Sequence, residues 1–147
     1  MTHGSISTRG APSRWLAPGP GQSSSLSAAR EWVRRAVGDI GEEHCLAVQV
    51  VVTELLTNAD DHAGGAGTLR LRTESSPCRV HVELDDKSAE PPVLNQARPG
   101  DLRGRGLMMV DNLSEEWGFR PREGGGKTVW ARIACDAYEW EPWAQAA

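Results

Sequence analysis

Hydrophobic residues recur at helical spacing in the segment from about Glu42 to Ala63. Four of its apolar positions are separated by four, three and four residues, which is the spacing of one helix face. They are Val48, Val52, Leu55 and Ala59. The pattern predicts a long amphipathic helix that ends at the glycine run after residue 63.

A polar edge runs along the same predicted helix, beside its apolar face. It consists of Glu54, Asn58, Asp61 and His62, at relative positions i, i+4, i+7 and i+8. A carboxylate and a carboxamide one turn apart are costly to bury unless they are hydrogen-bonded or bound to a cation. The simpler interpretation is a polar edge that faces water, and the helix by itself does not decide between solvent and ligand.

Shorter patterns predict the remaining elements. A helix is expected from its N-cap, Ser27, to about Val37, and another over residues 107–113 after a long Pro-containing loop. Alternating apolar and polar residues predict strands at about 68–72, 80–84, 116–121 and 127–134. Because strands cluster instead of alternating with single helices, we expect an α+β fold. Its form would be a two-layer sandwich, with helices on one face of a mixed, mainly antiparallel sheet.

Composition and length set the domain organisation. The 147 residues suit one domain with a single core. Residues 1–25 are rich in Gly, Ser and Pro and predict a mostly disordered tail, in which Trp15 and Leu16 are candidates for an edge strand or anchor. The folded domain is expected at 26–135, followed by a C-terminal tail at 136–147 that holds Trp140 and Trp143.

Charge and cysteine content exclude several classes. A net charge of −4 argues against direct nucleic-acid binding, which needs a basic surface. No stretch approaches the roughly 18 apolar residues of a membrane span, and the N-terminus lacks a signal-peptide core, so we expect a cytoplasmic protein without membrane contact. The three cysteines have neither disulfide-framework nor zinc-ligand spacing, and each is expected to be a small buried residue.

A glycine-rich segment, Gly104-Arg105-Gly106, opens the helix predicted at 107–113. Glycines at a helix N-terminus let backbone N–H groups approach an anion closely, and Arg103 or Arg105 would add positive charge. A flexible hinge with an ordinary helix cap is an equally good interpretation of this segment taken alone.

Taken together, four segments resemble the GHKL ATPase superfamily, which includes gyrase, histidine kinases and MutL. Residues 54–63 (ELLTNADDHA) look like its N box, 82–92 (VELDDKSAEPP) like its adenine-binding segment, 103–110 (RGRGLMMV) like the end of its lid, and 126–130 (GKTVW) like its closing strand. Their order and spacing are similar to the short branch of anti-sigma-factor serine/threonine kinases, and the resemblance covers about residues 27–134.

The resemblance implies ATP and Mg²⁺ as cofactors and a role for each polar residue of the helix. Glu54 would be the catalytic base, and Asn58 would bind the Mg²⁺ that bridges the phosphates. His62 would lie near the phosphates or hold the helix end by a structural hydrogen bond. Asp60 and Asp61 add negative charge beside this site, so the direction in which they point matters.

The other segments would supply the rest of the nucleotide site. Asp86, preferred to Asp85 for its spacing to the prolines that follow, would accept the adenine amino hydrogen, and Thr128 would support that end. Ser88 stands where the superfamily usually has glycine. The phosphates would be bound by the lid segment, comprising Arg103, Gly104, Arg105, Gly106 and Leu107.

The function that the resemblance implies is an ATP-dependent serine/threonine kinase that phosphorylates a small anti-anti-sigma-type antagonist protein and so controls a sigma factor. A homodimer is also implied by resemblance. The same residues would serve a non-catalytic ATP-binding module that sequesters a partner, or an ATPase in which water attacks. An α+β interaction domain without nucleotide is the remaining alternative.

Overall fold

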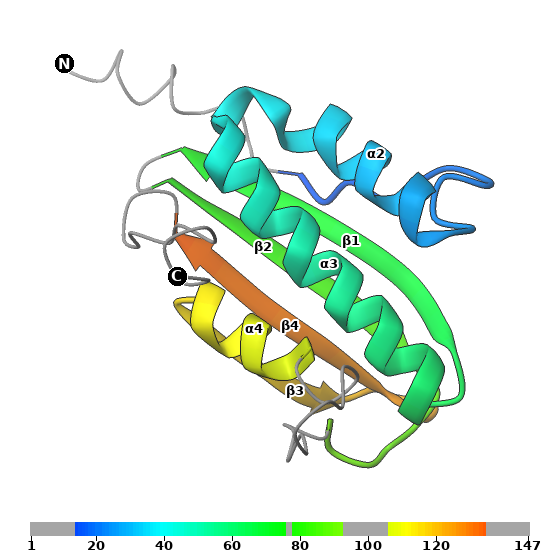
Figure 1. Ribbon diagram of the computed structural model, residues 1–147. Helices are drawn as coiled ribbons and strands as arrows, with labels where there is room; N and C mark the ends of the chain where they lie inside the picture. Colours follow the sequence, from blue (N-terminus) through cyan, green and yellow to red (C-terminus); the bar gives the residue numbers. More distant parts are fainter. Residues whose placement is uncertain (1–13, 76–77, 93–105, 135–147) are drawn as a thin grey trace, which may run out of the picture.

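The structure, a computed structural model, describes residues 14–75, 78–92 and 106–134. Within these ranges, a four-stranded sheet carries three α-helices on one face (Figure 1). The helices are α2 (Leu26–Val37), α3 (Glu42–His62) and α4 (Gly106–Leu113), with a short 3₁₀ turn, η1 (Gly38–Ile40), between the first two. The strands are β1 (Ala66–Ser75), β2 (Cys78–Asp86), β3 (Glu116–Pro121) and β4 (Lys127–Ala134). The predicted α+β sandwich is confirmed.

The strand order in the sheet is β1-β2-β4-β3. All three pairings between the described strands are antiparallel, so the expectation of a mixed sheet is wrong for this part of the chain. Strand β4 lies between β2 and β3, because the chain crosses from β2 through α4 to the sheet edge before it turns back. This order places the end of β2 directly beside the start of β4.

Helix α3 forms the centre of the helical layer and packs against α2, α4 and the sheet. The four residues of its predicted apolar face are all buried, each no more than 2% exposed: Val48, Val52, Leu55 and Ala59. Burying a Val or Leu side chain stabilises a fold by roughly 1.5–3 kcal/mol. This face therefore fixes the rotation of α3, and with it the direction of the polar edge.

The ends of several elements differ from the sequence expectation. Helix α2 begins two residues earlier than predicted, and its N-cap is Ser25, whose hydroxyl accepts a hydrogen bond from the Ala28 N–H (3.0 Å). The expected cap, Ser27, lies inside the first turn. Strands β1 and β2 extend beyond both ends of the ranges predicted from alternating apolar and polar residues, 68–72 and 80–84.

The N-terminal segment pairs with the sheet edge at Leu16. Its backbone exchanges two hydrogen bonds with Leu71 of β1 (2.7 and 2.9 Å), which confirms an edge anchor at this position. The Arg72 guanidinium lies 5.1 Å from the centre of the Trp15 ring, so the anchor also contacts the sheet through a cation–π interaction. Residues 1–13 and the predicted C-terminal tail, 136–147, lie outside the described residues.

The cysteines are not alike. Cys45 is a free, buried thiol, as expected. Cys78 is disulfide-bonded and only partly buried, so the expectation of three small buried residues is wrong for it. In the described part of the chain, we find no helix with the length and apolar character needed to cross a membrane.

Candidate functional site

The ends of three elements meet at one end of the sheet. The chain leaves α3 through Gly64, where an added Cβ would lie 3.8 Å from the Cβ of Lys87, the residue that follows β2. Helix α4 joins β3 at the opposite end of the sheet, where Glu116 pairs with Arg132. The N-terminus of α4, at Gly106, therefore points back toward the end of β2 (Figure 1).

The polar edge of α3 lies one to two turns before that junction. Glu54 and Asn58 are both partly buried, and Leu55 and Ala59 beside them belong to the core. Within the described part of the chain, neither polar side chain has a hydrogen-bond or ion-pair partner. Burial raises the pKa of the Glu54 carboxyl. Such groups are usually paired, so a carboxyl and an amide one turn apart, both without a partner in the described ranges, are available for a ligand.

The residues at the end of α3 are more exposed. Asp60, Asp61 and His62 are all solvent-exposed, and Asp61 is engaged in a further interaction. The two aspartates are therefore exposed to solvent, and their charges are not buried beside Glu54 and Asn58. His62 does not share the buried setting of those two residues, which favours its interpretation as a residue of the helix end.

Asp86 ends β2 and is buried, with 3% of its surface exposed. The Lys127 ammonium of β4 donates to its Oδ1 (3.0 Å) and lies 2.9 Å from its Oδ2. The Ser88 N–H also donates to Oδ1 (2.9 Å), which closes a tight turn directly after the strand. Lys127 completes the turn by donating to the Ser88 carbonyl (3.2 Å). The carboxylate is thus held in one orientation from two sides.

Gly126 allows this arrangement. Its φ is +80°, and a Cβ at this position would lie only 2.2 Å from the Asp86 carbonyl oxygen. Only glycine lets the β3–β4 loop approach the end of β2 so closely. The glycine run at 124–126 therefore forms the hairpin loop between β3 and β4, and it also places the buried Lys127 opposite Asp86.

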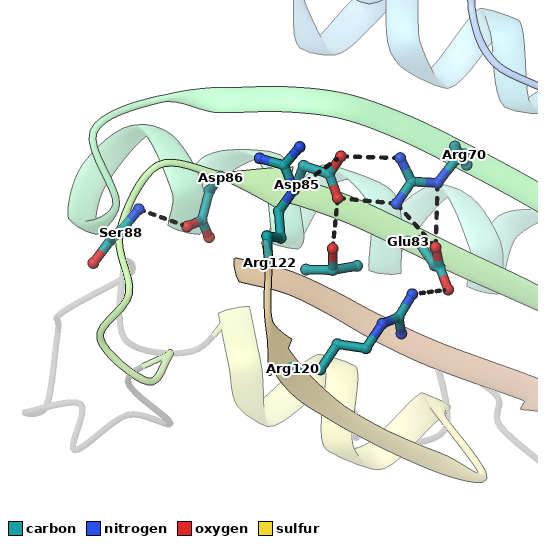
Figure 2. A network of polar contacts seen from close by, with 8 residues as sticks. Arg70, Glu83, Asp85, Asp86, Ser88, Arg120 and Arg122 are labelled. Carbon is teal, nitrogen blue, oxygen red and sulfur yellow. Dashed lines mark hydrogen bonds and ion pairs between the residues drawn. The ribbon is translucent and has the colours of Figure 1, made fainter. Parts of the chain in front are cut away.

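Asp85 points to the opposite face of the sheet, because successive strand residues alternate. There the Arg70 guanidinium donates to both of its carboxylate oxygens (2.9 and 3.0 Å) and also to Glu83, as Figure 2 shows. The Thr128 hydroxyl donates to Asp85 Oδ1 at 2.7 Å. These contacts lower the pKa of the Asp85 carboxyl, with the Arg70 hydrogen bond as the largest cause.

Two predicted site residues are therefore apart. Thr128 pairs with Asp85 in the strand register and lies on the face away from Asp86, so the geometry gives no support to its predicted adenine role. Lys127 occupies the position opposite Asp86 instead, and sequence reasoning missed it. The available signal was a lysine that opens a strand directly after a glycine run.

The lid segment is described only in part. Gly106 is the first residue of α4, and the Leu107 side chain is buried in the core, 2% exposed, so only the Leu107 backbone is placed to contact an anion at the helix start. Arg103, Gly104 and Arg105 lie outside the described residues. Among the described residues no group of three His, Cys, Asp or Glu side chains is placed to hold a metal ion.

A family model for the histidine kinase-like ATPase domain matches residues 20–133. Because the match spans most of the chain and every described helix and strand except the last residue of β4, the chain belongs to this family. Domains of this kind bind ATP, and the chain is thus a nucleotide-binding domain. A comparison with curated proteins gave no match.

Proposed function

We propose that this chain is an ATP-dependent serine/threonine protein kinase that acts as an anti-sigma regulator. Its protein substrate would be a small antagonist of the anti-anti-sigma type, and the regulated partner a sigma factor. The observation that carries the proposal is the pair of Glu54 and Asn58 on the partly buried edge of α3, near the converging ends of β2 and α4. Neither side chain of this pair has a partner among the residues that the structure describes.

The phosphate end of the site would use this pair together with the start of α4. Asn58 presents an amide oxygen, the ligand type that Mg²⁺ prefers when phosphates and water supply the rest of its shell. A bound Mg²⁺ would neutralise phosphate charge. The backbone N–H groups at the N-terminus of α4 are oriented for an anion, and Asp86 would accept the adenine amino hydrogen at the other end.

Glu54 is suited to act as the base. In the proposed transfer, the oxygen of a substrate hydroxyl forms a bond to the γ-phosphorus, and the bond from that phosphorus to the β,γ-bridging oxygen breaks, releasing ADP. The hydroxyl proton passes to a Glu54 carboxylate oxygen. Burial raises the pKa of the Glu54 carboxyl toward neutral pH. A general base is most effective when its pKa lies near the pH at which the enzyme works. Because phosphoryl transfer depends mostly on positioning and charge, few further groups are needed.

The test is transfer of labelled γ-phosphate from MgATP to purified small antagonist-type proteins of the same organism. We expect label on a serine or threonine with the wild-type protein and a loss of about a hundredfold or more with Glu54→Gln, since a positioned base contributes about 10²–10⁴-fold. ATP affinity should stay within about threefold. Full transfer by Glu54→Gln would exclude Glu54 as the base.

Two further outcomes separate the alternatives. ATP binding without label on any antagonist would identify a non-catalytic module that works by sequestration. Release of free phosphate without any protein substrate would identify an ATPase, in which water replaces the hydroxyl.

A further inference from the structure

The disulfide bond of Cys78 lies at the end of the sheet away from the candidate nucleotide site. Cys78 is the first residue of β2, and Asp86 is the last. Cys78 is disulfide-bonded, whereas Cys45 is a free thiol. The chain contains three cysteines, so the partner of Cys78 within the same chain is Cys135. Cys135 lies outside the described residues and directly follows Ala134, the last residue of β4.

The strand register supports this partner. Strands β2 and β4 are antiparallel, and Arg79 pairs with Ala134. Continued by one step, the same register would put Cys78 opposite Cys135. Residues opposite each other in an antiparallel pair have Cα atoms about 4.5–5.5 Å apart, which is within the roughly 4.4–6.8 Å that bridged cysteines span. A bond between these two residues therefore joins β2 to the end of β4 without any change in the sheet.

Cys78 and Cys45 differ in their access to thiol reagents. Cys78 is only partly buried and borders the short connection from β1. Cys45 is buried in the core, 6% exposed, and burial raises the pKa of its thiol. Because the thiolate is the attacking species in thiol–disulfide exchange, a buried Cys45 that stays protonated does not take part. The disulfide of Cys78 is thus the accessible redox group, and Cys45 is an internal control.

We infer that Cys78 and Cys135 form a reversible oxidation site, which a dithiol reductant opens and which sets the stability of the folded domain. A thiolate of the dithiol attacks one sulfur, the protein S–S bond breaks, and the leaving sulfur takes up a proton. The second thiol of the reductant then attacks the mixed disulfide. The protein gains two thiols, and the dithiol, which supplies both electrons and both protons, becomes a disulfide. This inference does not depend on nucleotide binding.

Reduction removes one of two clamps between β2 and β4. The ion pair of Asp86 with Lys127 joins the same strands at their other end and is not affected by a reductant. The disulfide closes a long loop, from residue 78 to residue 135, and a cross-link of this kind restricts the unfolded chain. The reduced protein should therefore keep its fold but unfold more readily, and a lower stability decreases the amount of folded protein in a cell.

Thiol alkylation and peptide mapping test the bond itself. The full chain is equilibrated with either a glutathione redox couple or dithiothreitol, and its free thiols are alkylated after denaturation. Under oxidising conditions, we expect alkylation of Cys45 alone and one linked peptide pair that contains Cys78 and Cys135. Dithiothreitol should make all three cysteines available, and its replacement by the glutathione couple should restore the linked pair. A bond to Cys45, a bond between two chains, or three free thiols under oxidising conditions would overturn the inference.

Urea unfolding tests the effect of the bond on stability. Dithiothreitol should lower the unfolding midpoint of wild type by roughly 1–3 M, the usual effect of losing one native disulfide in a small domain. Cys78→Ser and Cys135→Ser should have no response to dithiothreitol, whereas Cys45→Ala, the matched control, should keep it. Each response compares one protein in two buffers, so a general loss of stability does not imitate it. An unchanged wild-type midpoint overturns the inference even if the serine variants do not fold, and so does a full response in Cys78→Ser.

Discussion

Replacing Gly126 by alanine should separate the end of β4 from the end of β2. The new Cβ would lie 2.2 Å from the Asp86 carbonyl oxygen, whereas ordinary contact begins at 3.4 Å, so the two backbones must move apart by about 1.2 Å. A shift of that size stretches the contacts of about 3 Å between Lys127 and Asp86 beyond hydrogen-bonding distance.

Two costs combine in this variant. A non-glycine residue at a left-handed φ of +80° costs roughly 1–2 kcal/mol, and overpacking against a rigid neighbour costs about 1–3 kcal/mol more. We expect the free energy of unfolding to fall by about 2–5 kcal/mol, measured from urea unfolding curves. ATP affinity should fall with it, because Asp86 loses its fixed orientation.

Gly124→Ala is the matched control for the backbone cost. Gly124 has a similar φ of +91°, but an added Cβ there would have no neighbour within 4 Å. This variant should lose only about 1–2 kcal/mol of stability and keep its ATP affinity. Equal unfolding midpoints for the two variants would refute the close approach between Gly126 and Asp86.

Three further predictions address single groups. Burial raises the pKa of Glu54 above 4.5, so the ionised carboxyl destabilises the fold as pH rises through the raised value. Glu54→Gln should therefore unfold at a higher urea concentration than wild type at pH 7. Below pH 4.5 the two proteins should have the same unfolding midpoint. The pKa of Glu115 is lowered to about 2, chiefly by the hydrogen bond from Arg79. NMR titration of the Glu115 carboxyl should therefore find its midpoint at about pH 2 in wild type and at a higher pH in Arg79→Met. Thr128→Val should cost about 1 kcal/mol of stability, for the lost hydrogen bond to Asp85, without changing ATP affinity more than twofold; a large loss of affinity would restore its adenine role.

The fold was predictable wherever a local pattern decides the structure. The spacing of apolar residues in α3 identified a buried face, and that face in turn fixed the direction of Glu54 and Asn58. Alternation predicted β3 and β4 with their observed bounds. The N-cap of α2 is Ser25 and not Ser27, because two serines so close in sequence offer equally good caps and the packing of the helix selects one.

The adenine end was less predictable, because it depends on strand register. A shift of one residue moves a side chain to the other face of a sheet, and this separates Thr128 from Asp86 and brings in Lys127. The register is set by tertiary pairing and by the close approach of Gly126, neither of which appears in the local sequence pattern. The described strands pair only in antiparallel fashion, which the sequence did not predict for the same reason, since strand orientation is not a property of any single segment.

The most direct test of the nucleotide site is calorimetric titration with ATP, with and without Mg²⁺, of wild type, Asn58→Ala and Asp86→Asn. We expect one ATP per chain, a loss of Mg²⁺-dependent affinity in Asn58→Ala alone, and at least about tenfold weaker binding by Asp86→Asn under both conditions. Absence of binding by the wild type, or wild-type affinity in Asp86→Asn, would contradict a site built from the polar edge of α3 and the end of β2.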